Sequence, residues 1–282
     1  MKHVGSGPVP ADVREGRAKG AAQLMLRVRE AYAEPLAAET LFDWHTVLLG
    51  GVADPKALNV GTWRDSPEPM QVVSGAYGKW TVHYEAPPAD RVPEEMARYI
   101  SWFNDSAPGG RQAIQPGPVR SAIAHLYFES IHPFEDGNGR IGRALSEKAL
   151  SQGLGRPVVL SLSDVIEQGR NEYYDALKRA QRSIDVTEWV HYFVNTIVDA
   201  QARADEQVGF ILAKARFFDR HDDALSERQK KTLVRMLEAG PGGFEGGMNA
   251  RKYMSMTKVS KATATRDLQH LTEIGALLPV GA

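Results

Sequence analysis

The sequence predicts a mainly α-helical protein: a helical bundle that carries one small β-hairpin, followed by a small helical domain at the C-terminus. Apolar residues recur at helical spacing through most of the chain, one pair of short stretches is rich in β-branched and aromatic residues, and the charge balance changes after Asp223. Of the 282 residues, 43% are hydrophobic and 24% are charged. These values are typical of globular proteins and exclude a wholly disordered or collagen-like chain.

The first domain is predicted to be helical throughout, apart from the hairpin. Residues 1–21 are rich in glycine, proline and charge, and we expect a partly ordered lead-in there. The helical pattern begins at Ala22, and the domain extends over residues 22–224. Further helices are predicted at about 38–49, 94–103, 119–130, 140–152, 163–181 and 186–218.

The hairpin is predicted between the second and third of these helices. Residues 71–74 and 80–85 are rich in β-branched and aromatic side chains, and Gly75 and Gly78 lie between them. This is the only clear β pattern in the first 220 residues.

The C-terminal domain is predicted over residues 225–282. Residues 226–282 contain nine Lys and Arg but only five Asp and Glu, a net charge of +4 in a chain whose total is −1. Helices are expected at Ser226–Glu238, Ala250–Met256 and Lys261–Ile274, with a glycine-rich loop after the first.

Cysteine and long apolar runs are both missing from the sequence. The absence of cysteine excludes a disulfide scaffold, a thiol nucleophile and a thiolate zinc site, and it fits a cytoplasmic protein. No apolar run approaches the roughly 20 residues of a membrane helix, and the first residues have no apolar signal-peptide core. We therefore expect no membrane association.

One stretch, HPFEDGNGRIGR at 132–143, combines the residue types that handling a polyphosphate requires. Gly137 and Gly139 let the backbone approach an anion closely, and a loop that feeds a helix N-terminus points free N–H groups at it. Asp136 is a hard oxygen ligand suited to Mg²⁺. The alternative is a capped turn between two helices with solvated charges, and the full combination of residues disfavours it.

Three side chains of this stretch suggest specific chemistry. Arg140 and Arg143 lie about one helical turn apart, so both can grip phosphate oxygens. Histidine side chains can titrate near neutral pH, so His132 is a candidate to accept a proton from an attacking hydroxyl.

The same stretch resembles the signature of the Fic family, HPFx(D/E)GN(G/K)R followed by a second arginine. The resemblance extends over roughly residues 22–200, with a core at about 90–200, and includes the hairpin and the segment RNEYYDALKRAQ at 170–181. It implies a mostly helical fold and transfer of AMP from ATP to a Ser, Thr or Tyr hydroxyl of a target protein, with release of pyrophosphate. Gly139 favours AMP transfer, because relatives of the phosphorylating Doc type tend to carry lysine there.

The resemblance also implies roles for individual residues. His132 would be the general base, Asp136 would hold Mg²⁺ between the α- and β-phosphates, and Arg140 and Arg143 would grip the β- and γ-phosphates. Gly137, Asn138 and Gly139 would form an anion hole, and Phe134 would anchor the loop in the core. The residues expected around ATP are therefore Phe134, Gly137, Gly139, Tyr173, Tyr174 and Gln181, although the last three are equally compatible with a core role.

The hairpin resembles the flap of that family, along which the target's modified segment pairs as an added strand. Val72, Val73, Val82 and Tyr84 are the flap residues expected to dock the target. The alternative is a capping hairpin without a partner.

Many Fic proteins contain an inhibitory helix, (S/T)xxxE(G/N), and the nearest string here is ADVREG at 11–16. We interpret it as a coincidence, because alanine replaces the first Ser or Thr and its surroundings do not indicate a packed helix. The expectation is that this chain is not self-inhibited and labels itself readily. Removal of AMP from a modified protein, which usually relies on the inhibitory glutamate, is accordingly disfavoured.

The segment VSKATATRDLQHL at 259–271 is similar to the recognition helix of winged helix-turn-helix regulators. Ser260 is expected to cap the helix, and Lys258, Lys261, Thr263 and Arg266 are expected to face outward. DNA contact, protein docking and dimerisation all stay open for this domain.

The sequence thus predicts a protein adenylyltransferase with ATP as co-substrate, Mg²⁺ as cofactor and a target protein as partner, and it leaves a homodimer open. The alternative is a nucleotide-sensing, DNA-binding transcriptional regulator. The presence of His132, Asp136, Arg140 and Arg143 favours the enzyme, because a sensor could dispense with the base.

Overall fold

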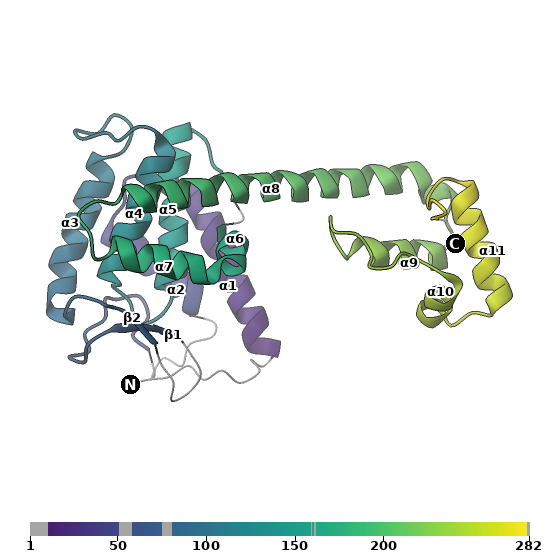
Figure 1. Cartoon of the computed structure of the whole chain (residues 1–282), viewed down its shortest axis with the longest axis horizontal. Coiled ribbons are helices and arrows are strands. Elements are labelled where there is room, and N and C mark those ends of the chain that lie inside the picture. The colour runs from purple at the N-terminus through teal and green to yellow at the C-terminus, as the bar shows by residue number, and fades with distance from the viewer. Residues whose placement is uncertain (1–10, 51–57, 75–80, 159, 161, 281–282) are drawn as a thin grey trace. The chain divides into compact units, whose positions relative to one another are not determined.

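The computed structural model describes residues 11–50, 58–74, 81–158, 160 and 162–280, and the described chain is mostly helical, as predicted (Figure 1). One antiparallel hairpin joins β1 (Gln71–Ser74) to β2 (Thr81–Glu85). The helices are α1 (Ala11–Glu30), α2 (Ala38–Leu49), α3 (Val92–Asp105), α4 (Gly117–Ile131), α5 (Asn138–Leu154), α6 (Leu162–Gln168), α7 (Arg170–Ala180), α8 (Thr187–His221), α9 (Glu227–Leu237), α10 (Ala250–Thr257) and α11 (Lys261–Glu273).

Two helix boundaries differ from the prediction. The single helix expected over 163–181 is two helices, α6 and α7, which meet at Gly169. Glycine is a poor residue for a helix interior, and here the chain turns at that point.

The first helix begins at Ala11 rather than Ala22. The string at 11–16 is therefore helical, contrary to expectation, and Glu15 is exposed. The apolar periodicity is confined to the second half of α1, where Leu24 and Val28 are buried. The close approach of α1 to α2 depends on Gly20, because a Cβ there would lie 2.6 Å from the carbonyl oxygen of Leu48.

The chain forms two compact units, residues 1–201 and 202–282. The division falls inside α8, whereas the sequence predicted a boundary near Leu225. The reason is that a continuous helix crosses it. Phe217 and Phe218, near the end of α8, pack with the C-terminal helices and so belong to the second unit.

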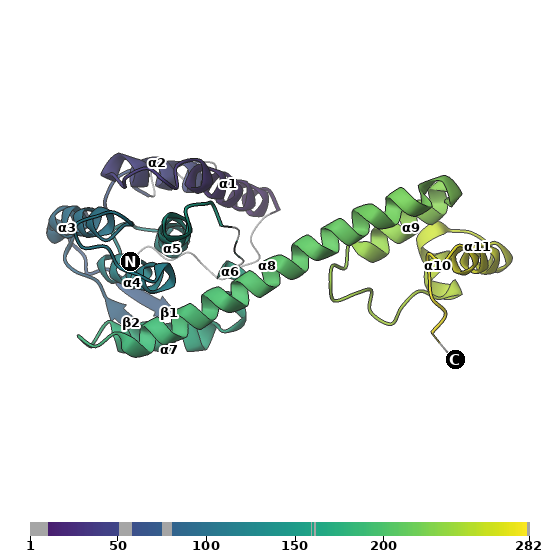
Figure 2. The ribbon, with the colours of Figure 1, turned by 90° about the horizontal axis from the view of Figure 1, so that it is seen from above.

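The first unit is built around α4 and α5, which pack along each other (Figure 1). In Figure 2, α5 lies between α4 and the pair formed by α1 and α2. Gly117 of α4 and Gly153 of α5 allow this close packing, since a Cβ on Gly153 would lie 3.0 Å from the Cα of Gly117. The loop between α4 and α5 is the HPFEDG segment at 132–137, and the rest of the stretch begins α5. The core helices therefore hold both ends of that loop.

The hairpin is confirmed as predicted, and it is attached to the end of α4. Val72 pairs with Tyr84 in the antiparallel register. The Tyr84 hydroxyl donates a hydrogen bond to the carbonyl oxygen of Ser130 at 2.8 Å. Gly75 and Gly78, the expected turn, lie outside the described residues.

The second unit is a small bundle of α9, α10, α11 and the end of α8. Ser260 caps α11 by accepting a hydrogen bond from the Thr263 N–H, as the sequence predicted. Asp267 of α11 accepts hydrogen bonds from Arg228 of α9 at 2.8 Å and from the Tyr253 hydroxyl of α10 at 2.8 Å. This network joins the three helices. Over residues 202–280 the structure has no strand, so no wing follows α11 there.

A helix needs about 20 mostly apolar residues to cross a bilayer. Within the described ranges, no helix combines that length with sufficient apolarity.

Two ionisable residues of α5 are buried beneath α1. Lys148 donates hydrogen bonds to the carbonyl oxygens of Ala31 and Tyr32, just beyond the end of α1. Glu147 is only 5% exposed. Its burial raises the pKa of this carboxyl to about 8, although Arg29 and Arg143 oppose the shift. Glu147 is therefore neutral at pH 7.

The neutral state of Glu147 predicts a pH-dependent stability. In the unfolded chain this carboxyl ionises near its ordinary pKa of 4.5, whereas the folded protein keeps the proton up to about pH 8. Its contribution to the free energy of unfolding is thus complete below pH 4.5 and is lost as the pH rises through 8. Denaturant unfolding between pH 5 and 8 should show the wild type losing stability relative to Glu147→Gln. A difference between the two proteins that does not change with pH would contradict this assignment.

Candidate active site

The loop between α4 and α5 begins with an unusual backbone conformation. His132 is left-handed, with φ 51° and ψ 60°, which is uncommon for a residue other than glycine. It precedes Pro133, and a residue before proline avoids the right-handed helical region. The left-handed backbone of His132 and the proline after it end α4 at Ile131. The chain therefore turns at His132, the predicted base.

Asn138 fixes the shape of this loop. The Phe134 N–H donates to Oδ1 of Asn138 at 2.9 Å, and Nδ2 of Asn138 donates to the carbonyl oxygen of Phe134 at 2.7 Å. The Asn138 side chain is buried and directed at the loop backbone. Any part that it has in an anion hole is therefore limited to its backbone N–H.

Phe134 anchors the loop from inside the core. Its ring is fully buried, stacks on His45 at a centroid distance of 4.1 Å and packs on Trp63 at 5.1 Å. This position fits the predicted anchor. The predicted contact of Phe134 with ATP stays a prediction, because the buried ring faces the core.

His45 of α2 supports the loop, a role that the sequence pattern did not indicate. The Gly61 N–H donates to Nδ1 of His45 at 2.9 Å, so Nε2 carries the proton and donates to the carbonyl oxygen of Asp136 at 3.1 Å. Burial lowers the pKa of His45, although Asp136 opposes the shift. The only sequence signal was a histidine on the apolar face of a predicted helix.

Arg64 is the second support that was missed. Its guanidinium donates to the carbonyl oxygens of His132 at 2.8 Å, Pro87 at 2.5 Å and Ile131 at 3.4 Å. Its backbone N–H donates to the carbonyl oxygen of Pro133 at 2.9 Å. The residue is 4% exposed, and burial lowers its pKa. Arg64 lies between a predicted helix and the predicted hairpin, and nothing in the local pattern singles it out.

The predicted phosphate-binding side chains lie at the start of α5. Nη2 of Arg140 is 3.6 Å from Oδ2 of Asp136, and Nε of Arg143 donates to the Ser163 hydroxyl at 2.9 Å. Burial lowers the pKa of Arg140, Asp136 opposes the shift, and the positive charges of Arg17 and Arg143 add to it. Concentrated positive charge beside a helix N-terminus is the environment that a polyphosphate requires.

A magnesium ion would have one protein carboxylate here. The Asp136 side chain is 38% exposed, and its Oδ1 accepts a hydrogen bond from the Gly137 N–H at 2.6 Å. Among the described residues, no three His, Cys, Asp or Glu side chains form a metal-binding group. One exposed carboxylate fits Mg²⁺, which proteins often bind through one or two carboxylates together with substrate phosphates.

The three residues expected beside adenosine differ in accessibility. Tyr173 is buried, and its hydroxyl lies 2.8 Å from Nε2 of His125. This position favours the core alternative, and its contact with the nucleotide stays a prediction. Tyr174 is half-buried, and its contact stays a prediction. Gln181 follows α7, and its Nε2 donates to the carbonyl oxygen of Glu129 at 3.4 Å.

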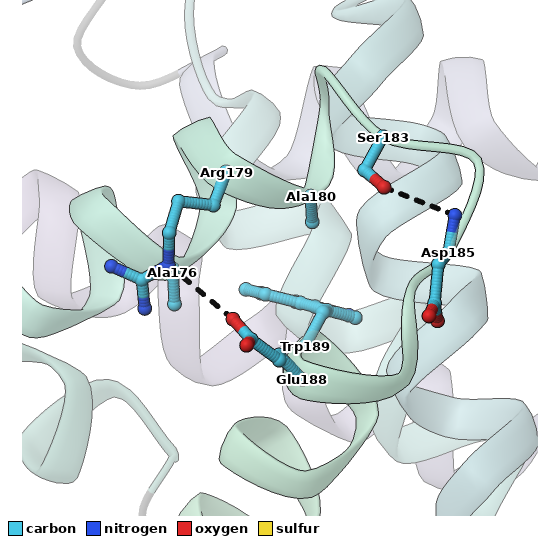
Figure 3. Close-up of a pocket in the computed structure, with 7 residues that line it drawn as sticks. All are labelled: Ala176, Arg179, Ala180, Ser183, Asp185, Glu188 and Trp189. Carbon is cyan, nitrogen blue, oxygen red and sulfur yellow. Dashed lines mark hydrogen bonds and ion pairs between the residues drawn. The ribbon is translucent and has the colours of Figure 1, made fainter.

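A separate pocket of about 250 Å³ lies where α7 ends and α8 begins (Figure 3). Arg179 and Glu188 form an ion pair across it at 3.7 Å. No residue of the 132–143 loop lines it. The full lining is Ala176, Arg179, Ala180, Ser183, Asp185, Glu188 and Trp189.

Residues 35–150, which include the α4–α5 loop, match the model of the Fic/DOC family. This part of the chain is therefore similar to a Fic/DOC domain. Its fold is also that of solved Fic proteins. A Fic family protein from Desulfovibrio desulfuricans G20 aligns with a TM-score of 0.56 at 23% identity, over 95% of this chain and 70% of that one. A Fic domain containing signaling protein from Bacteroides thetaiotaomicron aligns with a TM-score of 0.51 at 19% identity, over 70% and 73% of the two chains.

Curated relatives of the Fic/DOC domain are named as adenylyltransferases. The protein adenylyltransferase Fic of Culex quinquefasciatus is 34% identical over 101 residues, which is 36% of this chain and 18% of that protein. A probable protein adenylyltransferase of Aquifex aeolicus is 30% identical over 128 residues, 40% of this chain and 36% of that protein. The similarity therefore covers about a fifth to a third of these relatives.

The support given by Arg64 can be tested with Arg64→Lys. Lysine keeps the charge but cannot bond the several carbonyl groups that the planar guanidinium reaches. We expect a loss of about 2–4 kcal/mol in the free energy of unfolding, because charge-assisted hydrogen bonds are lost from a buried site. Denaturant titration of the wild type and Arg64→Lys measures this difference in the free energy of unfolding. Arg91→Lys is the matched control, since the Arg91 side chain is 58% exposed. Equal effects of the two substitutions would contradict the assignment.

Proposed function

We propose that this protein transfers AMP from ATP to a Ser, Thr or Tyr hydroxyl of a target protein and releases pyrophosphate. The supporting observation is the α4–α5 loop, which presents His132 at one end and the helix N-terminus with Arg140 and Arg143 at the other. The adenylyltransferase names of the relatives support the same reaction.

The residues of the chain would have the following roles in this reaction. His132 accepts the proton of the target hydroxyl while its oxygen forms a bond to the α-phosphorus of ATP. The bond from that phosphorus to the bridging oxygen breaks, and pyrophosphate leaves with its charge stabilised by Arg140 and Arg143. The proton then passes from His132 to solvent. Mg²⁺, held by Asp136 and the phosphates, would supply further charge neutralisation when bound.

We also propose that the hairpin docks the target segment. In the described part of the chain the sheet has two strands, so each has an edge without a strand partner. A peptide could add to such an edge through its backbone, which would leave the side chain to be modified loosely specified. Val72 and Val73 on β1 and Val82 and Tyr84 on β2 are the positions concerned, and Val82 is 44% exposed.

Intact-mass measurement after incubation with ATP and Mg²⁺, alone and with cell lysate, tests the reaction. We expect one AMP mass to be added by the wild type, and its rate to fall by about 10²–10⁴ in His132→Ala, as for loss of a general base. His191→Ala is the control, because this histidine is exposed on α8. A phosphate-sized addition, or normal transfer by His132→Ala, would contradict the proposal.

A second function, DNA binding, is favoured by the geometry of α10 and α11. The two helices are joined by a short turn in which Lys258 is left-handed. The exposed residues of α11 lie along one face and none of them is acidic before Glu273; they are Lys261, Ala262, Thr265, Arg266, Gln269 and Thr272. Thr263, expected to face outward, is half-buried beside Ser260. A regulator that reads DNA with α11 and nucleotide with the first unit would fit this arrangement.

The DNA proposal can be tested by fluorescence anisotropy with a random-sequence duplex at several salt concentrations. The double substitution Lys261→Ala, Arg266→Ala should weaken binding and reduce the salt slope by about two, because each lost phosphate contact removes about 0.9. Arg98→Ala, an exposed arginine on α3, is the control. Absence of salt-dependent binding in the wild type would overturn the proposal and favour protein docking.

A further inference from the structure

A buried carboxylate lies behind the proposed base. Glu129 is on α4, one turn before His132, and is 5% exposed. Its Oε2 is 3.6 Å from Nδ1 of His132. Within the described chain, Nδ1 of His132 and Oε1 of Glu129 are buried and have no hydrogen-bond partner. The buried imidazole nitrogen therefore lies close to this carboxylate without a hydrogen-bond partner of its own in the described residues.

The neighbouring residues leave room for this carboxylate and keep it charged. A Cβ at Gly142 would lie 2.5 Å from Oε1 of Glu129, so only glycine leaves the space that the carboxylate occupies. Burial by itself would raise the pKa of Glu129, but His132, His125 and Arg143 together hold that pKa below its ordinary value. Glu129 is consequently ionised at neutral pH.

A comparison with Glu147 shows that this ionised state is specific to Glu129. Both side chains are 5% exposed and both have an oxygen without a hydrogen-bond partner. Glu147 avoids the cost of a buried charge by keeping its proton. Glu129 instead stays charged beside His132. A buried carboxylate of this kind contributes little to folding, because its desolvation offsets most of its attraction to the surrounding cations.

We propose that Glu129 is the positioning residue of His132: it accepts a hydrogen bond from Nδ1–H, leaves Nε2 free as the base, and stabilises the imidazolium that forms. The proposal rests on the base role given to His132 above. When the target hydroxyl gives its proton to Nε2, the ring becomes a cation and attracts the Glu129 carboxylate more strongly. The 3.6 Å separation would then shorten to a hydrogen bond, as such contacts do on binding and reaction.

Kinetics of AMP transfer test the proposal through Glu129→Gln, which keeps the shape of the side chain and removes its charge. We expect kcat to fall about 10- to 10³-fold, with an unchanged KM for ATP, since Glu129 supports the base and does not face the phosphates. Glu147→Gln is the matched control, and it should leave kcat unchanged because it replaces one neutral group with another. A wild-type kcat in Glu129→Gln, or a change in KM alone, would overturn the proposal.

The protonation of the imidazole gives a readout that requires neither ATP nor a target. Long-range ¹H–¹⁵N spectra, with the His132 signals assigned by their loss in His132→Ala, should show the proton on Nδ1 in the wild type and in Glu147→Gln. Glu129→Leu should lose this preference, because nothing else holds Nδ1–H. A proton on Nε2 of the neutral wild-type ring would overturn the proposal, as would an unchanged tautomer in Glu129→Leu.

The kinetics of AMP transfer and the tautomer of His132 distinguish failure of the positioning proposal from failure of the proposed function. If the tautomer depends on Glu129 but no variant transfers AMP, the positioning stands and the proposed function fails. If the wild type transfers AMP and its neutral ring carries the proton on Nε2, the proposed function stands and the positioning role of Glu129 fails. Should Glu129→Leu fail to fold, the wild-type tautomer and the kinetics of Glu129→Gln still decide.

Discussion

The turn between α4 and α5 is held in shape by two hydrogen bonds between the Asn138 side chain and the Phe134 backbone. The rest of the site depends on this turn, because it fixes His132 relative to the N-terminus of α5. The supports come from distant parts of the sequence: Arg64 bonds the carbonyl oxygens at the end of α4, and His45 bonds the carbonyl oxygen of Asp136. Because buried side chains hold the loop from the core side, its charged side chains can stay accessible on the other side.

The two buried carboxylates of the core have opposite pKa shifts. Burial raises the pKa of Glu147 to about 8, although Arg29 and Arg143 oppose the shift. Glu129 is surrounded by two histidines and Arg143, and its pKa stays below the ordinary value. The local charges, rather than the degree of burial, therefore decide which carboxylate is available to interact with an imidazolium. In this way α4 and α5 provide both a scaffold and the electrostatic environment of the proposed base.

The motif-bearing parts of the molecule were the most predictable. The helices around 38–49 and 140–152, the hairpin strands and the Ser260 cap follow from periodicity, β-branched residues and capping preferences, which act over a few residues. The start of α1 was missed because the residues before Ala22 have no apolar periodicity. The division of the two units inside α8 was missed because a continuous helix carries no compositional signal for it.

The sequence by itself determined the helical class, the hairpin and the group of residues from His132 to Arg143, because these features depend on local patterns and on a contiguous motif. Only the tertiary structure decided that Phe134 and Tyr173 are closed off in the core, and that Arg64, His45 and Glu129 surround the loop. The physical reason is that burial and long-range hydrogen bonds depend on which segments meet in space. Arg64 and His132 are 68 residues apart in the sequence, and no local pattern encodes their contact.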